Sequence, residues 1–382
     1  MRYDYIFAGM GAAGLSLAFR LATLPAFRKK SILLIDRQPK TQNDRTWCFW
    51  AKTPGLFGPI VSKEWTHIWF RSPLYSARIP LAPYRYHMIR GQDFYAYVLH
   101  HLAQNPNVHI EYGHIQGIQD GENGAHVQVN GQIRVANWVF SSLPEEKLFL
   151  RPGVQYLKQH FKGWVVQTSK PVFDPATATF MDFRIAQEGQ ARFMYLLPTS
   201  AYQSLVEFTV FSSDLLPVQE YEEQLRQYFL QHLGLQADEY QILEEEFGVI
   251  PMADAVLKPR GGRHLVHIGT RGGQSKASTG YTFVNIQKQS ENIVAALLQK
   301  GLPFPSPAPS RFRLYDQMLL NVLQKERYAA RDIFALMFAR HPIKRVLRFL
   351  DEESRLDEEI KIMAKMPPLP FLKAGLDLLT RF

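Results

Sequence analysis

The sequence predicts an α/β protein made of a doubly wound parallel-sheet domain, a second domain built on an antiparallel sheet, and a helical C-terminal region. Three observations support this prediction. They are a strand–turn–helix–strand opening within residues 5–36, short alternating apolar segments between residues 164 and 211, and helical periodicity after a proline-rich segment at 303–309. The 382 residues, 46% hydrophobic and 21% charged, are typical of a globular protein and exclude a disordered or collagen-like chain.

The N-terminal segment has the order of elements with which a parallel α/β sheet begins. Residues 5–8 form a short apolar run typical of a buried strand, and residues 9–14 form a glycine-rich turn. Apolar residues at helical spacing predict a helix over 15–22, and residues 31–35 predict a second strand that ends at Asp36. Together these elements make a βαβ unit.

The glycine turn matches a dinucleotide-binding fingerprint, Gly9-x-Gly11-x-x-Gly14. The first glycine permits a tight turn, the second lets a pyrophosphate approach the backbone, and the third allows close packing of helix and strand. The helix N-terminus offers free amides to the phosphates. Asp36 lies 22 residues beyond Gly14, where an acid binds ribose hydroxyls. A packing turn followed by a surface aspartate is the alternative.

The rest of the chain predicts a change from parallel to antiparallel structure. We expect helices over 90–102, 220–233 and 282–299, a three-stranded meander at 108–112, 125–129 and 135–141, a second sheet at 164–170, 179–183, 191–197 and 204–211, and a late strand at 264–269. The predicted domains are a nucleotide-binding domain over 1–145 with 255–300, a substrate domain over 146–254, and a helical region over 310–382. The prolines at 303–309 predict a hinge before that region.

FAD and NAD share the glycine fingerprint, so the choice between them depends on the rest of the chain. A nicotinamide-dependent dehydrogenase normally completes six parallel strands, whereas this chain turns antiparallel after residue 120. A single N-terminal βαβ unit, an antiparallel second sheet and a late strand containing Gly269 favour FAD. We therefore predict a Rossmann-like FAD-binding domain of the glutathione-reductase type of flavoprotein.

Charge, cysteine content and apolar runs narrow the functional classes. The 44 Lys and Arg residues against 35 Asp and Glu give a net charge of +9. This charge is compatible with a protein that binds nucleic acid, with one that binds anionic lipid, and with one that binds neither. Cys48 is the only cysteine, which excludes an intrachain disulfide. None of the 12 histidines forms a pair at the spacing of metal ligands with an acidic residue near it, so we expect no metal site. We find neither a signal peptide nor about 18 consecutive apolar residues, and expect a cytosolic protein.

Five short elements then occur in a specific order along the chain. They are Asp44-Arg45-Thr46-Trp47-Cys48-Phe49-Trp50, Leu205-Val206-Glu207-Phe208-Thr209, Phe247-Gly248-Val249-Ile250-Pro251-Met252, Gly269-Thr270-Arg271-Gly272-Gly273 with Thr279-Gly280-Tyr281-Thr282, and Arg348-Phe349-Leu350-Asp351-Glu352. Over nearly the whole chain they resemble the bacterial lycopene cyclase family. The resemblance implies a lycopene β-cyclase that converts linear ψ ends to β rings, through γ-carotene to β-carotene, without net redox change. It also implies reduced FAD as cofactor, with NAD(P)H serving only to reduce it.

The chain departs from the family pattern at two positions and from redox flavoenzymes at a third. Lys276-Ala277-Ser278 stands where the family often has His-Pro before Thr-Gly-Tyr, and Val206 stands where Ile is frequent. Thr270 follows Gly269 where flavin hydroxylases and dehydrogenases of this fold usually have an aspartate that holds the ribityl chain. We expect the flavin contacts to come instead from Arg90 and from the backbone at Gly269, Gly272 and Gly273.

Glu207 is the candidate catalytic acid. Ring closure at a polyene end needs a proton on a terminal C=C bond, attack of an internal alkene on the carbocation, and loss of a neighbouring proton. A carboxylic acid can donate that proton at neutral pH if burial raises its pKa. Glu207 lies in the apolar run 204–211, and strand alternation places it on one face with Leu205 and Thr209. From the pattern alone, a glutamate paired with an arginine or facing solvent is the alternative; the resemblance favours the acid.

Aromatic side chains would stabilise the carbocation through their π faces. We predict Trp47, Trp50, Phe208, Phe211 and Tyr281 as the substrate pocket, although most aromatics in such a chain belong to the core. Asp182 is predicted as a second buried carboxylate, acting as a proton relay or a structural partner.

Two other acidic clusters are assigned to the surface. The run of three acids Glu244-Glu245-Glu246 is interpreted as the solvated end of a helix. The alternative is that Glu246 faces the pocket. Asp351-Glu352-Glu353 predicts a helix cap.

The C-terminal region carries the last signal. Residues 311–350 contain nine Lys or Arg and three Asp or Glu, and apolar Ile333, Phe334, Met337 and Phe338 lie near this charge. An amphipathic cationic helix predicts peripheral binding to the cytoplasmic membrane, which suits a carotenoid substrate; an ordinary basic surface helix is the alternative. Without a recognised motif we expect no nucleic acid partner. Two rival functions remain: a flavin-dependent monooxygenase or reductase of the same fold, and a carotenoid or lipid binder without catalysis.

Overall fold

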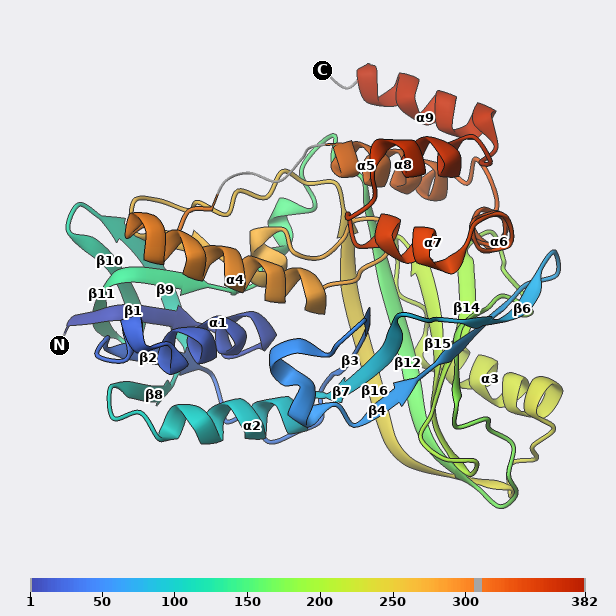
Figure 1. Ribbon diagram of the computed structural model, residues 1–382, viewed down its shortest axis with the longest axis horizontal. Helices are drawn as coiled ribbons and strands as arrows, with labels where there is room; N and C mark the ends of the chain where they lie inside the picture. Colours follow the sequence, from blue (N-terminus) through green and yellow to red (C-terminus); the bar gives the residue numbers. More distant parts are fainter. Residues whose placement is uncertain (1, 306–310, 381–382) are drawn as a thin grey trace.

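The computed structural model describes residues 2–305 and 311–380 and contains three β-sheets. In Figure 1 the N-terminal sheet and its helices lie at one end of the long axis, and the long strands of the second sheet lie at the other. The hinge predicted over 303–309 falls largely outside the described residues, which omit 306–310. The mixed α/β class and the helical C-terminal region are as predicted.

The first sheet begins with the predicted βαβ unit. β1 (Arg2–Ala8) pairs in parallel with β2 (Ile32–Asp36) and with β11 (Gln132–Ser141). β8 (Val108–Tyr112) extends the parallel part beyond β2, and β17 (Leu265–His267) extends it beyond the second half of β11. The continuous apolar runs of β1 and β2 are buried on both faces, as in other parallel sheets.

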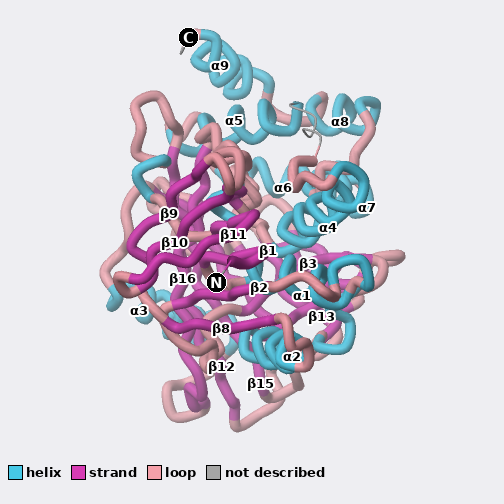
Figure 2. Tube along the Cα trace, turned by 90° about the vertical axis from the view of Figure 1, so that its left-hand side faces the viewer, coloured by secondary structure: helices cyan, strands magenta, loops and turns pink. Residues whose placement is uncertain are grey.

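Helices cover one face of the parallel part of this sheet, and the antiparallel hairpin that continues the sheet from β11 packs against the other face (Figure 2). The helices are α1 (Ala12–Thr23), α2 (Gly91–Ala103) and α4 (Phe283–Lys300), and the hairpin is β9 (Ile115–Gly121) with β10 (Gly124–Val129). The predicted meander is therefore corrected: β9, β10 and β11 form it, and β8 pairs with β2 instead. Alternation identifies a strand but does not identify its partner.

The second sheet has seven strands in the order β16, β12, β15, β14, β13, β5, β6, and only the β13–β5 pair is parallel. Their bounds are β16 Tyr240–Ala253, β12 Tyr156–Thr168, β15 Gln203–Ser212, β14 Ala191–Pro198, β13 Thr177–Asp182, β5 His67–Arg71 and β6 Ser76–Pro80. The predicted domain boundary at residue 145 does not separate the two sheets. β5 and β6 belong to the second sheet although they lie within the predicted first domain. β5 pairs with β13, which lies about a hundred residues further along the chain, and β6 pairs with β5.

A small third sheet joins the two larger ones. It contains β3 (Thr46–Ala51), β7 (Arg85–Arg90) and β4 (Lys63–Trp65), with β7 in the centre. On one face Trp50 packs in the core of the second sheet, and on the other Phe49 packs in the core of the first sheet. Residues 46–51 therefore run along the boundary between the two cores.

The remaining helices pack around the second sheet. α3 (Val218–Tyr228) covers one face, and α6 (Ala330–Arg340) and α7 (Ile343–Leu350) contribute to the core on the opposite face. α5 (Arg311–Gln324), α8 (Leu356–Met363) and α9 (Pro368–Leu379) lie beyond them (Figure 1).

The apolar side chains of α6 do not face outward as predicted. Ile333, Phe334, Met337 and Phe338 are all buried, and Phe338 stacks on Phe70 at a ring-centroid distance of 4.7 Å. The prediction that these four residues contact a membrane is therefore wrong. None of the helices in the described ranges has the length and apolar character that a membrane span needs.

Candidate active site

Three neighbouring strands of the second sheet form the floor of a cavity of about 460 Å³. Alternate residues of a strand point to the same face, and the registers align those residues in rows across β12, β15 and β16. In one row Phe161 lies between Thr209 and Gly248, and a Cβ at residue 248 would lie 2.4 Å from the Phe161 ring. All three residues of this row line the cavity.

The next row brings two glutamates together across a glycine. Gly163 of β12 is the register partner of Glu207 on β15 and of Glu246 on β16. A Cβ at residue 163 would lie 2.7 Å from Cγ of Glu207, so the glycine leaves the room in which the glutamate lies. On the other side of Glu207, Tyr195 of β14 continues the row. Both glutamates and the tyrosine line the cavity.

Glu207 has the environment of a carboxyl group that stays protonated. Its residue is only 7% exposed, and within the described part of the chain it forms no salt bridge. Burial raises the pKa of Glu207 well above its usual value, and negative charge on Glu246 raises it further. The structure thus places a buried carboxyl group without an ionic partner in the cavity, where the sequence pattern left an ion-paired or solvated glutamate open.

Glu246 lies in the same cavity, and its carboxylate has partners that Glu207 lacks. Burial raises the pKa of Glu246 above its usual value, and hydrogen bonds from Thr46 and the positive charge of Arg45 reduce that rise. Thr46 donates to it from its backbone nitrogen at 3.1 Å and from its hydroxyl at 2.8 Å. When the pair holds one proton, that proton therefore belongs on Glu207 and the charge on Glu246.

The glycine turn forms another wall of the cavity. Gly9 has a φ of +105°, which favours glycine, and a Cβ at Gly14 would lie 2.1 Å from the carbonyl oxygen of Gly9. A Cβ at Gly11 would meet no atom within 4 Å, and Gly11 lines the cavity with the first residues of α1. The turn thus has the tight bend, close packing and open backbone that the fingerprint predicts.

The two predicted side chains around this turn differ in placement. Asp36 does not line the cavity; it accepts a hydrogen bond from the backbone nitrogen of Met10 at 2.7 Å and so fastens the end of β2 to the turn. Arg90 forms an ion pair with Glu244 at 2.9 Å and is not among the residues that line the cavity. Arg45 lines the cavity instead, beside the glycine turn and β3.

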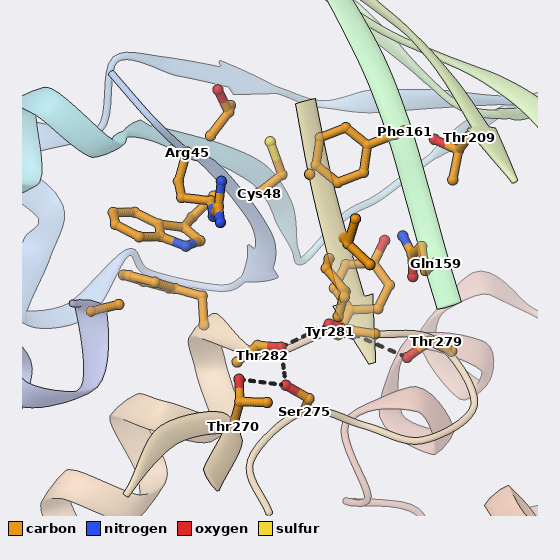
Figure 3. Close-up of a pocket in the computed structure, with 18 of the residues that line it drawn as sticks. Arg45, Cys48, Gln159, Phe161, Thr209, Thr270, Ser275, Thr279, Tyr281 and Thr282 are labelled. Atoms are coloured by element: carbon orange, nitrogen blue, oxygen red, sulfur yellow. Dashed lines mark hydrogen bonds between the residues drawn. The ribbon is translucent and has the colours of Figure 1, made fainter. Parts of the chain in front are cut away.

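The loop after β17 contributes the wall opposite the sheet. Gly269 has a φ of +60° and lines the cavity, whereas Gly272 and Gly273 form the following turn and do not. Figure 3 shows the hydroxyls of Thr270 and Thr282 joined through Ser275, with both hydrogen bonds at 3.0 Å. These bonds hold the two ends of the loop together at the cavity.

Lys276, at which the sequence departs from the family pattern, does not line the cavity and lies behind this loop. The Lys276 ammonium is buried and forms ion pairs at 2.9 Å with Asp316 of α5 and with Glu352. Ser278 donates to the same aspartate at 2.7 Å. Lys276 and Ser278 therefore anchor the loop to the C-terminal region, while Thr279, Gly280 and Tyr281 line the cavity.

The predicted pocket residues fall into two groups. Trp47, Phe211 and Tyr281 line the cavity. Trp50, Asp182 and Phe208 do not, and their placement is corrected.

Each of the three corrected residues has a structural partner. Trp50 packs behind Tyr281 at 4.8 Å and donates from Nε1 to Asp351 at 2.6 Å. Asp182 is fully buried, pairs with Arg184 at 2.6 Å and accepts a hydrogen bond from Tyr228. Phe208 lies on the opposite face of β15, in the core under α3, as the alternation that points Glu207 into the cavity requires.

The acidic clusters also differ from expectation. Glu244–Glu246 belong to strand β16 rather than to a helix end, and alternation turns Glu246 inward. Asp351 follows the C-terminus of α7, and burial raises its pKa to about 7. Among the described residues, no group of three or more His, Cys, Asp or Glu is placed to hold a metal ion.

Several lining residues were not predicted at all. They are the aromatics Tyr86, Phe161, Phe180, Phe193 and Tyr195, together with Arg45, Gln159, Thr209 and Phe334. The hydroxyls of Tyr86 and Tyr195 lie 2.6 Å apart. Alternation from Glu207 identifies Thr209 and Phe211, but the other residues reach the cavity only through pairing of distant strands.

Solved structures resemble this fold from end to end. A geranylgeranyl bacteriochlorophyll reductase-like protein from Thermoplasma acidophilum has a TM-score of 0.62 at 13% identity, with 100% of this chain and 99% of that chain covered. The p-nitrophenol 4-monooxygenase PnpA from Pseudomonas putida DLL-E4 has 0.59 at 13%, covering 97% and 98%. Halogenase PltM in complex with phloroglucinol and FAD has 0.59 at 13%, covering 95% and 85%. The fold is that of flavoprotein enzymes with a Rossmann-type nucleotide domain.

The family is shown by a separate comparison. The model of the lycopene cyclase protein family matches residues 4–376, nearly the whole chain. The chain belongs to the lycopene cyclase family. No curated protein sequence matches it.

Gly163 tests the geometry of the glutamate row. We expect Gly163→Ala to lower the free energy of unfolding by about 1–3 kcal/mol, because the new methyl group would overlap the stem of Glu207. Gly117→Ala in β9 is the matched control, since a Cβ there meets nothing within 4 Å. Denaturant unfolding compares the two variants, and equal stability would contradict the close approach.

Glu207 also predicts how stability depends on pH. A carboxyl whose pKa is raised in the folded state favours folding below its unfolded pKa, near 4.5, and loses that contribution as pH rises toward the folded value. The loss is about 1.4 kcal/mol for each pH unit that separates the folded pKa from the unfolded one. Relative to wild type, Glu207→Gln should therefore gain melting temperature steadily from pH 5 upward, on the order of a few degrees.

The control for this measurement is Glu122→Gln, at an exposed glutamate of the β9–β10 turn. Its melting temperature should follow that of wild type at every pH. A Glu207→Gln curve parallel to wild type would mean that Glu207 is not buried as a neutral acid.

Proposed function

We propose that the protein is a lycopene β-cyclase that closes the ψ ends of lycopene, or of a related linear carotenoid, into β rings. The observation that carries this proposal is the glutamate row. In it the Glu207 carboxyl, with a pKa well above its usual value, lies beside the hydrogen-bonded Glu246 carboxyl in a cavity with many aromatic side chains. Membership of the lycopene cyclase family supports the substrate class.

The reaction needs one proton and no electrons overall. Glu207 donates its proton to the terminal C=C bond, the internal alkene attacks the resulting carbocation, and a ring C–C bond forms. A neighbouring C–H bond then releases its proton, and the Glu207 carboxylate accepts it, which restores the acid. Glu246 holds the proton on Glu207 between turnovers, because two charged carboxylates in this row would repel each other.

The aromatic side chains stabilise the positive charge while the ring closes. Tyr281, Trp47 and Phe211 border the cavity from three different elements. An aromatic face over a cation contributes about 0.5–2 kcal/mol, with the larger values in dry sites. The cavity also keeps water from the carbocation, which would otherwise give an alcohol.

A flavin fits the wall opposite the glutamates. Gly11 offers open backbone at the N-terminus of α1, and Arg45, Gly269 and Thr270 line the same space. Thr270 leaves this wall without the acid that redox flavoenzymes usually have after Gly269. When bound, reduced FAD would supply negative charge beside the cation, with NAD(P)H as its reductant.

Glu207 and Glu246 give the decisive kinetic test. We expect Glu207→Gln to lower kcat by about 10²–10⁴-fold, because an amide cannot donate the proton. Glu246→Gln removes the repelling charge, lowers the pKa of Glu207 and shifts the alkaline limb of the kcat/KM profile to lower pH. Anaerobic assays with liposomal lycopene, FAD and NADPH, followed by chromatography of the pigments, measure both effects.

Glu245→Gln is the matched control, because Glu245 is exposed on the other face of β16 and pairs with Lys162. Normal cyclisation by Glu207→Gln would refute the acid assignment. NADPH consumption in proportion to modified pigment would favour the monooxygenase or reductase, and pigment binding without any product would favour a carotenoid binder.

The glycine turn tests the cofactor site without any assay of activity. Gly11→Ala should leave the melting temperature of the flavin-free protein unchanged but weaken FAD binding about tenfold or more, because its methyl group points into open cavity. Gly14→Ala should instead destabilise the flavin-free protein, because its methyl group meets the Gly9 carbonyl. Flavin fluorescence and thermal unfolding separate the two, and equal FAD binding by Gly11→Ala and wild type would place the flavin elsewhere.

A further inference from the structure

The two outermost helices of the C-terminal region carry apolar side chains on their solvent sides. On α9, Leu369, Leu372, Leu376 and Leu379 are each between 62% and 76% exposed, and their spacing of three and four residues places them on one face. On α8, Leu356, Ile360 and Met363 are exposed in the same pattern. We call the four leucines of α9 the outer leucine face.

This face is distinct from the packing of the helices. The opposite side of α9 buries Ala374 and Leu378, and Ala374 packs with Val322 of α5 and Ile333 of α6. α9 is therefore apolar on both sides, although only one side has a partner in the fold. Exposed apolar patches of this size mark interaction sites. In Figure 1, α9 lies at the edge of the molecule, away from both large sheets.

The charge around the face indicates what covers it. Residues 360–379 contain three lysines and one acid, Asp377, which forms ion pairs with Lys325 and Arg327. Lys365 and Lys373 are exposed and have no ion pair within the described residues, while Lys361 lies 3.5 Å from Asp357. Lysines beside an apolar helical stripe, on a chain of net charge +9, complement an anionic lipid surface.

We propose that the outer leucine face docks the protein onto an anionic lipid bilayer, with the leucines inserted at the level of the headgroups. This replaces α6 as the membrane contact. The docking surface follows from exposure and charge, and rests on the proposed function only for the substrate that the bilayer would hold.

The surface is close to the cavity through the packing of the helices. Ala374 of α9 packs with Ile333 of α6, and the next residue of α6, Phe334, lines the cavity. One helix layer therefore lies between the outer leucine face and the cavity wall. A bilayer on this face would bring an apolar ligand to the helices that border the cavity.

Vesicle flotation of the full chain tests the proposal. Wild type should bind vesicles of phosphatidylcholine with phosphatidylglycerol more tightly than vesicles of phosphatidylcholine alone. The triple variant L369S/L372S/L376S should bind the anionic vesicles at least about tenfold more weakly, from lost apolar contact. The double variant K365Q/K373Q should lose the preference for the anionic lipid.

The control is L74S/L150S, which changes two leucines that are 67% and 64% exposed elsewhere on the surface. Circular dichroism confirms folding of each variant, and the control should bind as wild type does. Equal binding by the triple variant and wild type, or no binding by wild type, would overturn the proposal. A dimer in sedimentation velocity that the triple variant abolishes, without a change in vesicle binding, would assign the face to a second copy of the chain.

A second readout separates this proposal from the proposed function. With lycopene dispersed in detergent, the triple variant should keep wild-type turnover, whereas Glu207→Gln should bind vesicles normally and lose turnover. Loss of turnover by the triple variant in detergent would overturn a role confined to docking.

Discussion

The site depends on one constraint of the second sheet: two glutamates must meet over a central strand that has no side chain between them. Gly163 provides that gap on β12, and antiparallel pairing on both of its sides brings Glu207 and Glu246 into one row. β12 must therefore be an interior strand, and it lies between β15 and β16 over most of its length. A shift of one residue on either side would turn one glutamate to the opposite face.

A neutral carboxyl in this row also requires closure of the cavity, and the walls come from distant parts of the chain. Thr46 of β3 fixes Glu246, Tyr281 closes the side near α4, and Phe334 of α6 closes the far end. Each wall is anchored behind the cavity. Trp50 supports Tyr281, and the buried Lys276 ion pairs tie the 269–282 loop to α5. Trp50, predicted as a pocket residue, is thus a support of a residue that lines the cavity.

The sequence predicted what is local and missed what depends on pairing. The glycine turn and the direction of Glu207 follow from short-range pattern, and the structure places them as that pattern requires. Asp36 ends β2 as predicted, but it does not line the cavity and its carboxylate is bound to the backbone of the turn. Glu246 was assigned to a helix end because three consecutive acids resemble a solvated segment, whereas in a strand alternate members face opposite sides. Phe208 was included for its aromatic ring although the alternation around Glu207 excluded it. The boundary predicted at residue 145 does not separate the sheets, because β5, with β6 beside it, pairs with the distant strand β13. Alternation along a strand carries no information about such pairing.

The placement of charge around the two glutamates explains why the pair is asymmetric. A cation beside Glu207 would stabilise its carboxylate, lower its pKa and end its use as an acid at neutral pH. The positive charge and the hydrogen bonds are placed on the Glu246 side instead, through Arg45 and Thr46. Glu207 then keeps its proton at a cost in folding free energy, because a buried carboxyl without an ionic partner resists ionisation that the unfolded chain allows. The apolar cores packed on the two faces of the sheet stabilise the fold and offset this loss of folding free energy. The instability of Glu207 as an anion is thus the property on which its proposed role as a proton donor depends.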